Sequence, residues 1–161
     1  MEILQYAITM EEDGEKYYRE QAARNADNPL RVVFEALADD EARHASLIRS
    51  KADGVPFQLE AANSLSGKQN LFSIAKDFHS SVEELPNQLE AYHAALDKEQ
   101  QSIDLYQGLL DKAEDDVSRG LFSFLVQEEK HHLEILDELF QHLNRPNNWV
   151  ESAEFGVREE Y

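Results

Sequence analysis

The sequence contains the pattern Glu-x-x-His twice, at matching places in two copies of a longer repeat. Glu41 is followed by His44, and Glu129 by His132, so both residues recur 88 positions later (129 − 41 = 88; 132 − 44 = 88). On a helix, side chains three positions apart share one face, with Cβ atoms roughly 5–6 Å apart, which suits two ligands of one metal ion. One such pair is common on solvated helices. The shared offset is what makes the two pairs informative.

The same offset aligns further residues of the two halves. These pairs are Ala7 with Ala95, Glu11 with Glu99, Tyr18 with Tyr106, Asp27 with Asp115, Arg31 with Arg119, and Phe34 with Phe122. Each copy therefore carries a Glu, a Tyr seven residues later, and a Glu-x-x-His whose Glu follows the first by thirty residues. The chain is predicted to contain two copies of one helical hairpin.

Apolar residues at helical spacing predict four helices, and turn signals separate them. The four apolar stripes are Leu4 to Ala22, Leu30 to Ile48, Leu89 to Leu110 and Leu121 to Phe140. Asn28 is expected to cap the second helix, with Pro29 in its first turn. Asp53-Gly54 is expected to end that helix, and Asn144-Arg145-Pro146 the fourth.

These elements predict an all-α domain over residues 1–143, with repeats at about 1–54 and 84–143. The crossover 55–83, with a possible short helix, is long enough to run the length of a bundle at ~3.3 Å per extended residue. The expected fold is a four-helix bundle of two helical hairpins with one long crossover between helices 2 and 3, the ferritin-like arrangement. Residues 144–161, including Trp149, form either an ordered tail or a partner contact.

The hairpin geometry places four glutamates in one layer. In an antiparallel hairpin, residues equidistant from the turn lie at the same height. Residue 26 is midway between Glu11 and Glu41, and residue 114 is midway between Glu99 and Glu129. Both midpoints fall in predicted turns, so the four side chains are expected to meet inside the bundle.

Four buried carboxylates repel each other unless their charge is compensated. Two divalent cations would do so; protons or ion pairs are alternatives, but no Lys or Arg occupies the inner stripes. One Glu from each of two helices and Glu-x-x-His from each of the others is the ligand set of di-iron and di-manganese bundles. Affinity alone would not exclude zinc. The candidate metal ligands are Glu11, Glu41, His44, Glu99, Glu129 and His132.

Within this set, Glu11 and His44 are assigned to one ion and Glu99 and His132 to the other. Glu41 and Glu129 are assigned to bridging positions. His131 competes with His132, because Glu128-x-x-His131 has the same spacing; the repeat register favours His132.

For other residues the sequence leaves alternative roles open. Asp40 and Glu128 are candidates to accept the second N–H of the ligand histidines, across the repeats, or are solvated acids. Tyr18 and Tyr106 either hydrogen-bond the carboxylates, stabilise an oxidised intermediate, or only pack. His79, His93 and His142 have no counterpart in the other repeat and are expected to be structural or exposed.

Charge and composition narrow the possible partners. The net charge of −18 argues against binding to nucleic acid or an anionic membrane. With no cysteine, the chain contains neither thiolate metal sites nor disulfides. No signal-peptide pattern or apolar run of ~20 residues occurs, so a soluble cytoplasmic protein is expected.

With these motifs in place, the chain resembles the rubrerythrin branch of the ferritin-like superfamily over roughly residues 1–143. The motifs that carry the resemblance are Ala7-Ile8-Thr9-Met10-Glu11 with Gly14 and Tyr17-Tyr18, Leu37-Ala38-Asp39-Asp40-Glu41 with His44, Glu99 with Ser102-Ile103 and Tyr106, and Glu128-Glu129 with His132. The resemblance implies two iron ions held by the six candidate ligands, redox chemistry with peroxide or dioxygen, and self-association, expected to give a homodimer.

Two features differ from rubrerythrins proper. The chain lacks the four cysteines of a rubredoxin domain, so electrons are expected from a separate donor protein. Ser102 stands where those proteins have a further glutamate ligand. The leading interpretation is a di-iron oxidoreductase that reduces peroxide or oxygen. An iron-binding or ferroxidase protein and a metal-stabilised interaction bundle are the alternatives.

Overall fold

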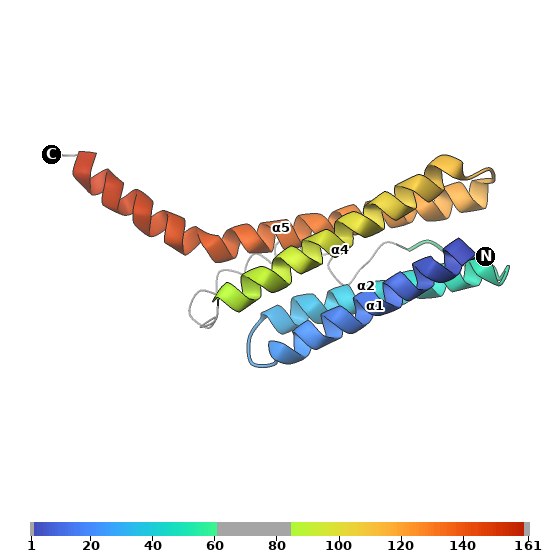
Figure 1. Ribbon diagram of the computed structural model, residues 1–161, viewed down its shortest axis with the longest axis horizontal. Helices are drawn as coiled ribbons and strands as arrows, with labels where there is room; N and C mark the ends of the chain where they lie inside the picture. The colour runs from blue at the N-terminus through green and yellow to red at the C-terminus, as the bar shows by residue number, and fades with distance from the viewer. Residues whose placement is uncertain (1, 61–84, 160–161) are drawn as a thin grey trace.

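The computed structural model describes the backbone of residues 2–60 and 85–159, and the side chains of residues 2–60 and 90–141. The helices in this part of the chain are α1 (Glu2–Arg24), α2 (Leu30–Ala52), α4 (Leu85–Lys112) and α5 (Asp116–Glu159). Helix α1 packs antiparallel to α2, and α4 antiparallel to α5 (Figure 1).

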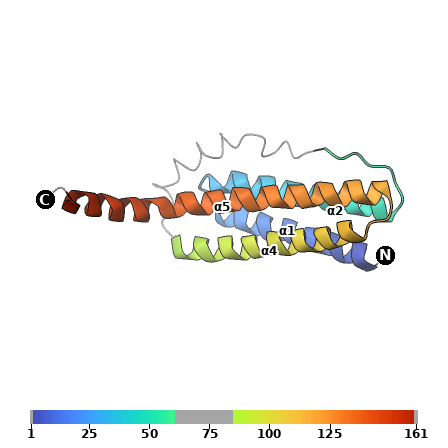
Figure 2. The same cartoon turned by 90° about the horizontal axis from the view of Figure 1, so that it is seen from above.

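The connectivity is that of a ferritin-like four-helix bundle. The turn between α1 and α2 and the turn between α4 and α5 lie at opposite ends of the molecule (Figures 1 and 2). The end of α2 and the start of α4 are therefore also at opposite ends. One long crossover joins the two hairpins, as the sequence predicts. The possible short helix within this crossover falls on residues 61–83, which lie outside the described residues.

The first hairpin has the predicted start and end signals. Asn28 Oδ1 accepts a hydrogen bond of 2.9 Å from the backbone N–H of Leu30, and Pro29 already has helical dihedral angles. At the other end of α2, Gly54 takes a left-handed φ of 69°. The N–H groups of Gly54 and Val55 then bond the carbonyls of Lys51 and Ser50, a Schellman motif.

The expected end of the fourth helix at Asn144-Arg145-Pro146 is wrong. Helix α5 continues through Pro146 to Glu159, and its C-terminal part projects beyond the other helices (Figures 1 and 2). A proline inside a helix removes one hydrogen bond and crowds the preceding turn, which can bend a helix without ending it. The tail expected from residue 144 onward is therefore helical up to Glu159.

The bundle contains a buried layer of polar side chains, formed by Glu11, Glu41, His44, Glu99, Glu129 and His132, with one apolar cluster on each side of it. One cluster is near the turn between α1 and α2 and contains Tyr18, Phe34, Leu37, Tyr92 and Leu136 among others. The other is near the turn between α4 and α5 and contains Ile8, Ile48, Tyr106, Leu121 and Leu125 among others. On every helix the polar layer falls between residues of the two clusters, so apolar side chains separate it from both ends of the bundle.

No helix among the described residues has the length and apolarity needed to cross a lipid bilayer.

Candidate metal centre

The polar layer brings together all six residues that the sequence singles out as candidate ligands. None of them is more than 4% exposed. Their ligand atoms form two groups, in each of which four donors lie within 4.8 Å of one another: Glu11, Glu41, His44 and Glu129 in one, and Glu41, Glu99, Glu129 and His132 in the other. Glu41 and Glu129 belong to both groups, so they occupy the place of bridging residues between two ions.

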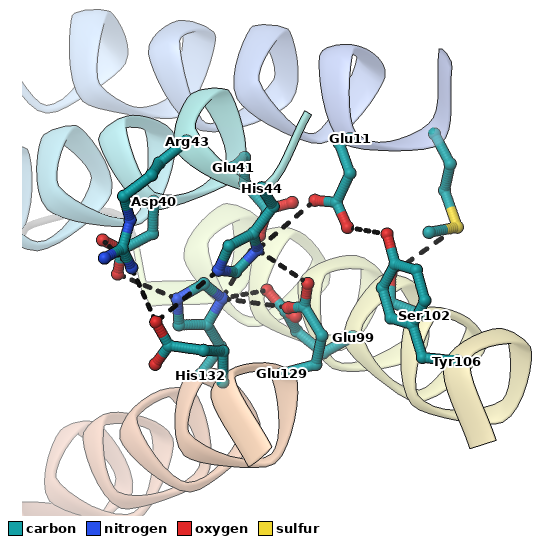
Figure 3. Close-up of polar contacts among 12 residues, drawn as sticks. Glu11, Asp40, Glu41, Arg43, His44, Glu99, Ser102, Tyr106, Glu129 and His132 are labelled. Carbon is teal, nitrogen blue, oxygen red and sulfur yellow. Dashed lines mark hydrogen bonds and ion pairs between the residues drawn. The ribbon is translucent and has the colours of Figure 1, made fainter. Parts of the chain in front are cut away.

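The two histidines point the same ring atom inward. Nδ1 of His44 lies 3.0 Å from Oε1 of Glu129, and Nδ1 of His132 lies 3.1 Å from Oε2 of the same residue. Nδ1 of His132 is also 3.2 Å from Oε1 of Glu41 (Figure 3). The 3.0 Å contact of His44 is a hydrogen bond, and the inward nitrogens and the carboxylates lie close enough together to form one donor set.

The outward nitrogens face acids of the opposite repeat. Nε2 of His132 lies 3.0 Å from Oδ2 of Asp40, and Nε2 of His44 lies 3.8 Å from Oε1 of Glu128. A carboxylate on the outer nitrogen fixes the tautomer of a ligand histidine and increases its basicity. Asp40 is therefore placed to orient His132 with Nδ1 toward the centre, whereas Glu128 lies on the outward side of His44 at more than hydrogen-bond distance from Nε2.

The two tyrosines also reach across the repeats. The hydroxyl of Tyr18 donates to Oε1 of Glu99, and that of Tyr106 donates to Oε1 of Glu11. Both rings are almost completely buried. Each tyrosine therefore holds a carboxylate that belongs to only one of the two donor groups, in addition to filling the core.

Arg43 covers the side of the centre where the outward nitrogens lie. Its guanidinium is 2.6 Å from Glu128 and 3.5 Å from Asp40 (Figure 3). Asp40 and Glu128 are repeat counterparts (128 − 40 = 88), so one cation forms ion pairs with an acid from each copy. The repeat counterpart of Arg43 is His131, so the repeat did not mark Arg43 as a functional residue. The sequence signal was only a basic residue beside an Asp-Glu pair.

Gly14 is the second functional position without a role predicted from sequence. A Cβ at this position would lie 2.9 Å from Oε2 of Glu41 and 3.3 Å from its Cδ. A side chain here would therefore displace the carboxylate of Glu41. The available signal was a glycine on the inner stripe of a long helix, where it costs about 1 kcal/mol relative to alanine.

Unpaired buried atoms test whether these residues fit a metal. Among the described residues, four buried polar side-chain atoms without a hydrogen-bond partner face the interior of this centre: Glu11 Oε2, Glu41 Oε1, Glu129 Oε2 and His132 Nδ1. The others are the outward His44 Nε2 and Tyr92 Oη. Such atoms are costly unless something binds them. Oxygen and imidazole donors suit iron, manganese or zinc, so the donor set fits divalent cations.

The titration behaviour of the centre reflects the crowding of its charges. Burial, together with the charges of Glu11 and Glu99, raises the pKa of Glu129 to about 8. Burial and the same kind of repulsion hold the pKa of Glu41 well above its usual range. Burial alone would lower the pKa of His44, but the charge of Glu129 holds it well above its usual range. The metal-free centre therefore retains protons at neutral pH.

We expect the metal-free protein to lose stability as the pH rises. The pKa of Glu129 is about 8 in the folded state against 4.5 in the unfolded chain, so the folded state binds the extra proton between these values. The stabilisation of the folded state that comes from this proton is fully present below about pH 4.5 and is lost as the pH rises through about 8. The raised pKa of His44 acts in the same direction above about pH 6.5. Urea unfolding of metal-free protein, from mildly acidic to mildly alkaline pH, measures the slope.

Glu129→Gln is the control for this pH dependence, because the amide imitates the protonated acid and cannot ionise. The substituted protein should show a smaller decrease in unfolding free energy over the same range. If the unfolding free energy of metal-free wild type is constant or rises with pH, the centre does not retain protons at neutral pH.

The histidines differ in their exposure to solvent. His132 is fully buried, while His131 is partly exposed. His93 is exposed, and its ring lies 5.2 Å from that of Phe140. The placement of the His79 side chain and that of His142 lie outside the described residues.

Comparison with known proteins adds one finding. A family model described as Rubrerythrin matches residues 2–140. No curated protein and no solved structure matches the chain.

Proposed function

Because the chain belongs to the rubrerythrin family of ferritin-like di-iron proteins, we propose that it binds two iron ions at this centre and reduces peroxide or dioxygen there. The observation that carries the proposal is the pair of four-donor groups that share Glu41 and Glu129. Glu11 and His44 would complete the site of one ion, and Glu99 and His132 that of the other. A separate donor protein would return the electrons, because the chain has no cysteine with which to hold a second iron centre of the thiolate type.

The chemistry supplied by the metals is a two-electron reduction. Two ferrous ions, when bound, would give one electron each, so that hydrogen peroxide takes up two electrons and two protons, its O–O bond breaks, and two water molecules form. The protein's part is to hold the ligands and exclude bulk water. Tyr18 and Tyr106 keep Glu99 and Glu11 in place, and the apolar clusters close the layer on two sides.

An anaerobic titration of metal-free protein with Fe(II), followed by mixing with peroxide or air, tests this function. We expect saturation at about two ions per chain, as the two donor groups predict. Faster oxidation by peroxide than by air would support peroxide as the substrate, and faster oxidation by air would indicate an oxidase or ferroxidase. An added reductant should then support repeated turnover. Oxidation of iron without turnover would instead indicate an iron-handling ferroxidase. Binding of redox-silent zinc alone would indicate a structural role for the metal.

A further inference from the structure

A narrow cavity connects the surface with the carboxylates of the centre. It has a volume of about 30 Å³ and lies between α1 and α4, which belong to different hairpins and approach each other only sparsely. Its lining runs from the exposed Gln101 and the partly exposed Lys98 to the buried Glu41 and Glu99. The cavity is therefore a passage toward the proposed ion positions and not an isolated void.

The passage exists because two small residues face it. Gly14 and Ser102 both line the cavity and are repeat counterparts (102 − 14 = 88). Gly14 contributes no side chain. The hydroxyl of Ser102 donates 3.1 Å to the carbonyl of Lys98 in its own helix and is 3.7 Å from Sδ of Met10. The serine is thus held against α4 and leaves the space in front of the carboxylates open.

The opposite side of the centre is covered. There the two histidine rings are followed by Asp40 and Glu128, and the guanidinium of Arg43 lies across both acids. Figure 3 shows His132, Asp40 and Arg43 on one side of Glu99 and Glu129, and Ser102 with Tyr106 on the other. A small molecule approaching from the α1–α4 side meets carboxylates directly, whereas one approaching from the other side meets an ion-pair layer.

We propose that this cavity is the entrance for the oxidant and that its size restricts the oxidant to hydrogen peroxide or a molecule of similar size. The inference rests on the proposed function. A volume of about 30 Å³ holds about two water-sized molecules, which matches the two heavy atoms of hydrogen peroxide. An organic hydroperoxide with a branched carbon group does not fit. Ser102 and Met10, which meet at the wall of the cavity, set its width.

The test uses one substitution that closes the passage and one that opens it. Ser102→Leu fills the cavity, and Met10→Ala widens it. Gln100→Leu is the matched control, since it adds the same side chain at an exposed position of the same helix. Iron affinity and stoichiometry are measured first for each variant. The second measurement is the association rate of nitric oxide, a diatomic probe, with the ferrous protein. The third compares oxidation rates with hydrogen peroxide and tert-butyl hydroperoxide.

We expect Ser102→Leu to bind two iron ions with affinities within about twofold of wild type, and to slow both nitric oxide association and oxidation by hydrogen peroxide at least about tenfold. Met10→Ala should raise the rate with tert-butyl hydroperoxide relative to hydrogen peroxide by about tenfold. Gln100→Leu should behave as wild type.

Two results overturn the proposal in different ways. If wild-type protein binds iron and reacts with peroxide, but Ser102→Leu leaves nitric oxide association unchanged and Met10→Ala leaves the rate ratio unchanged, the entrance is elsewhere and the proposed function stands. If wild-type protein binds no iron, both the function and the entrance are wrong. The Met10→Ala comparison remains decisive if Ser102→Leu does not fold.

Discussion

Replacing Glu129 with alanine is expected to abolish the tight binding of both iron ions. Glu129 is fully buried and offers an oxygen to each of the two donor groups, so its removal leaves both incomplete. We expect the affinity for each ion to fall by more than about 100-fold, since even groups that only orient ligands contribute 10–100-fold. Anaerobic Fe(II) titration by calorimetry gives the number of ions and their affinities. Circular dichroism shows whether the helices remain.

Glu99→Ala is the matched control for this substitution. Glu99 is also a buried acid, but it belongs to one donor group only. Its removal should weaken one ion and leave the other with affinity close to wild type. If both variants lose the same number of ions, Glu129 is not shared between the two positions, and the assignment of the bridging residues is wrong.

Metal removal is expected to cause the second large effect, a loss of thermal stability. A ligand that binds only the folded state at 1,000 times its Kd stabilises it by about 4 kcal/mol, so two ions give about 8 kcal/mol. For a domain of this size, 1 kcal/mol corresponds to about 2–4 °C in Tm, and the expected increase on loading is roughly 15–30 °C. The expected cause is local: bound metal would contact the unpaired oxygens of Glu11, Glu41 and Glu129 and compensate the repulsion between them.

Differential scanning calorimetry of metal-free and loaded protein measures this difference. Zinc should stabilise the protein as well as iron does, because charge compensation does not depend on redox activity, while only iron should support peroxide reduction. Glu129→Ala should show little increase in Tm with either metal. Identical transitions of loaded and metal-free wild type would show that the polar layer does not depend on metal for its stability.

Much of the fold could be predicted from the sequence, because most of the helix and ligand motifs occur in both copies of the repeat and support one another. The helix bounds near residues 28 and 54 were set by local hydrogen bonding of Asn28 and by the left-handed Gly54, both of which act through neighbouring residues. The meeting of the four glutamates followed from equal distances to the two turns, and the position of the two histidines followed from the Glu-x-x-His spacing. These features depend on spacing along the chain, which a sequence records directly.

Other features could not be inferred because they depend on contacts between the repeats. Arg43 bridges acids that are 88 residues apart, and its own counterpart is a histidine, so no repeated pattern marks it. The passage beside Ser102 is a cavity between two helices, and the spacing of residues along the chain does not predict such cavities. The continuation of α5 past Pro146 was missed because a proline is an ambiguous signal, compatible with an end or a bend.

The division of each donor group between the hairpins has a consequence for biosynthesis. The first group takes Glu11, Glu41 and His44 from the first hairpin but needs Glu129 from the last helix. A growing chain therefore emerges from the ribosome with three of these four donors and cannot complete the set until α5 has been made. The inner face of the first hairpin is covered by α4 and α5 in the complete bundle, so the first hairpin alone leaves its apolar stripe exposed and gains little from folding early. Assembly of the proposed metal site is thus tied to the synthesis of α5, and a product truncated after the first hairpin would lack Glu129 from the first group and Glu99, Glu129 and His132 from the second.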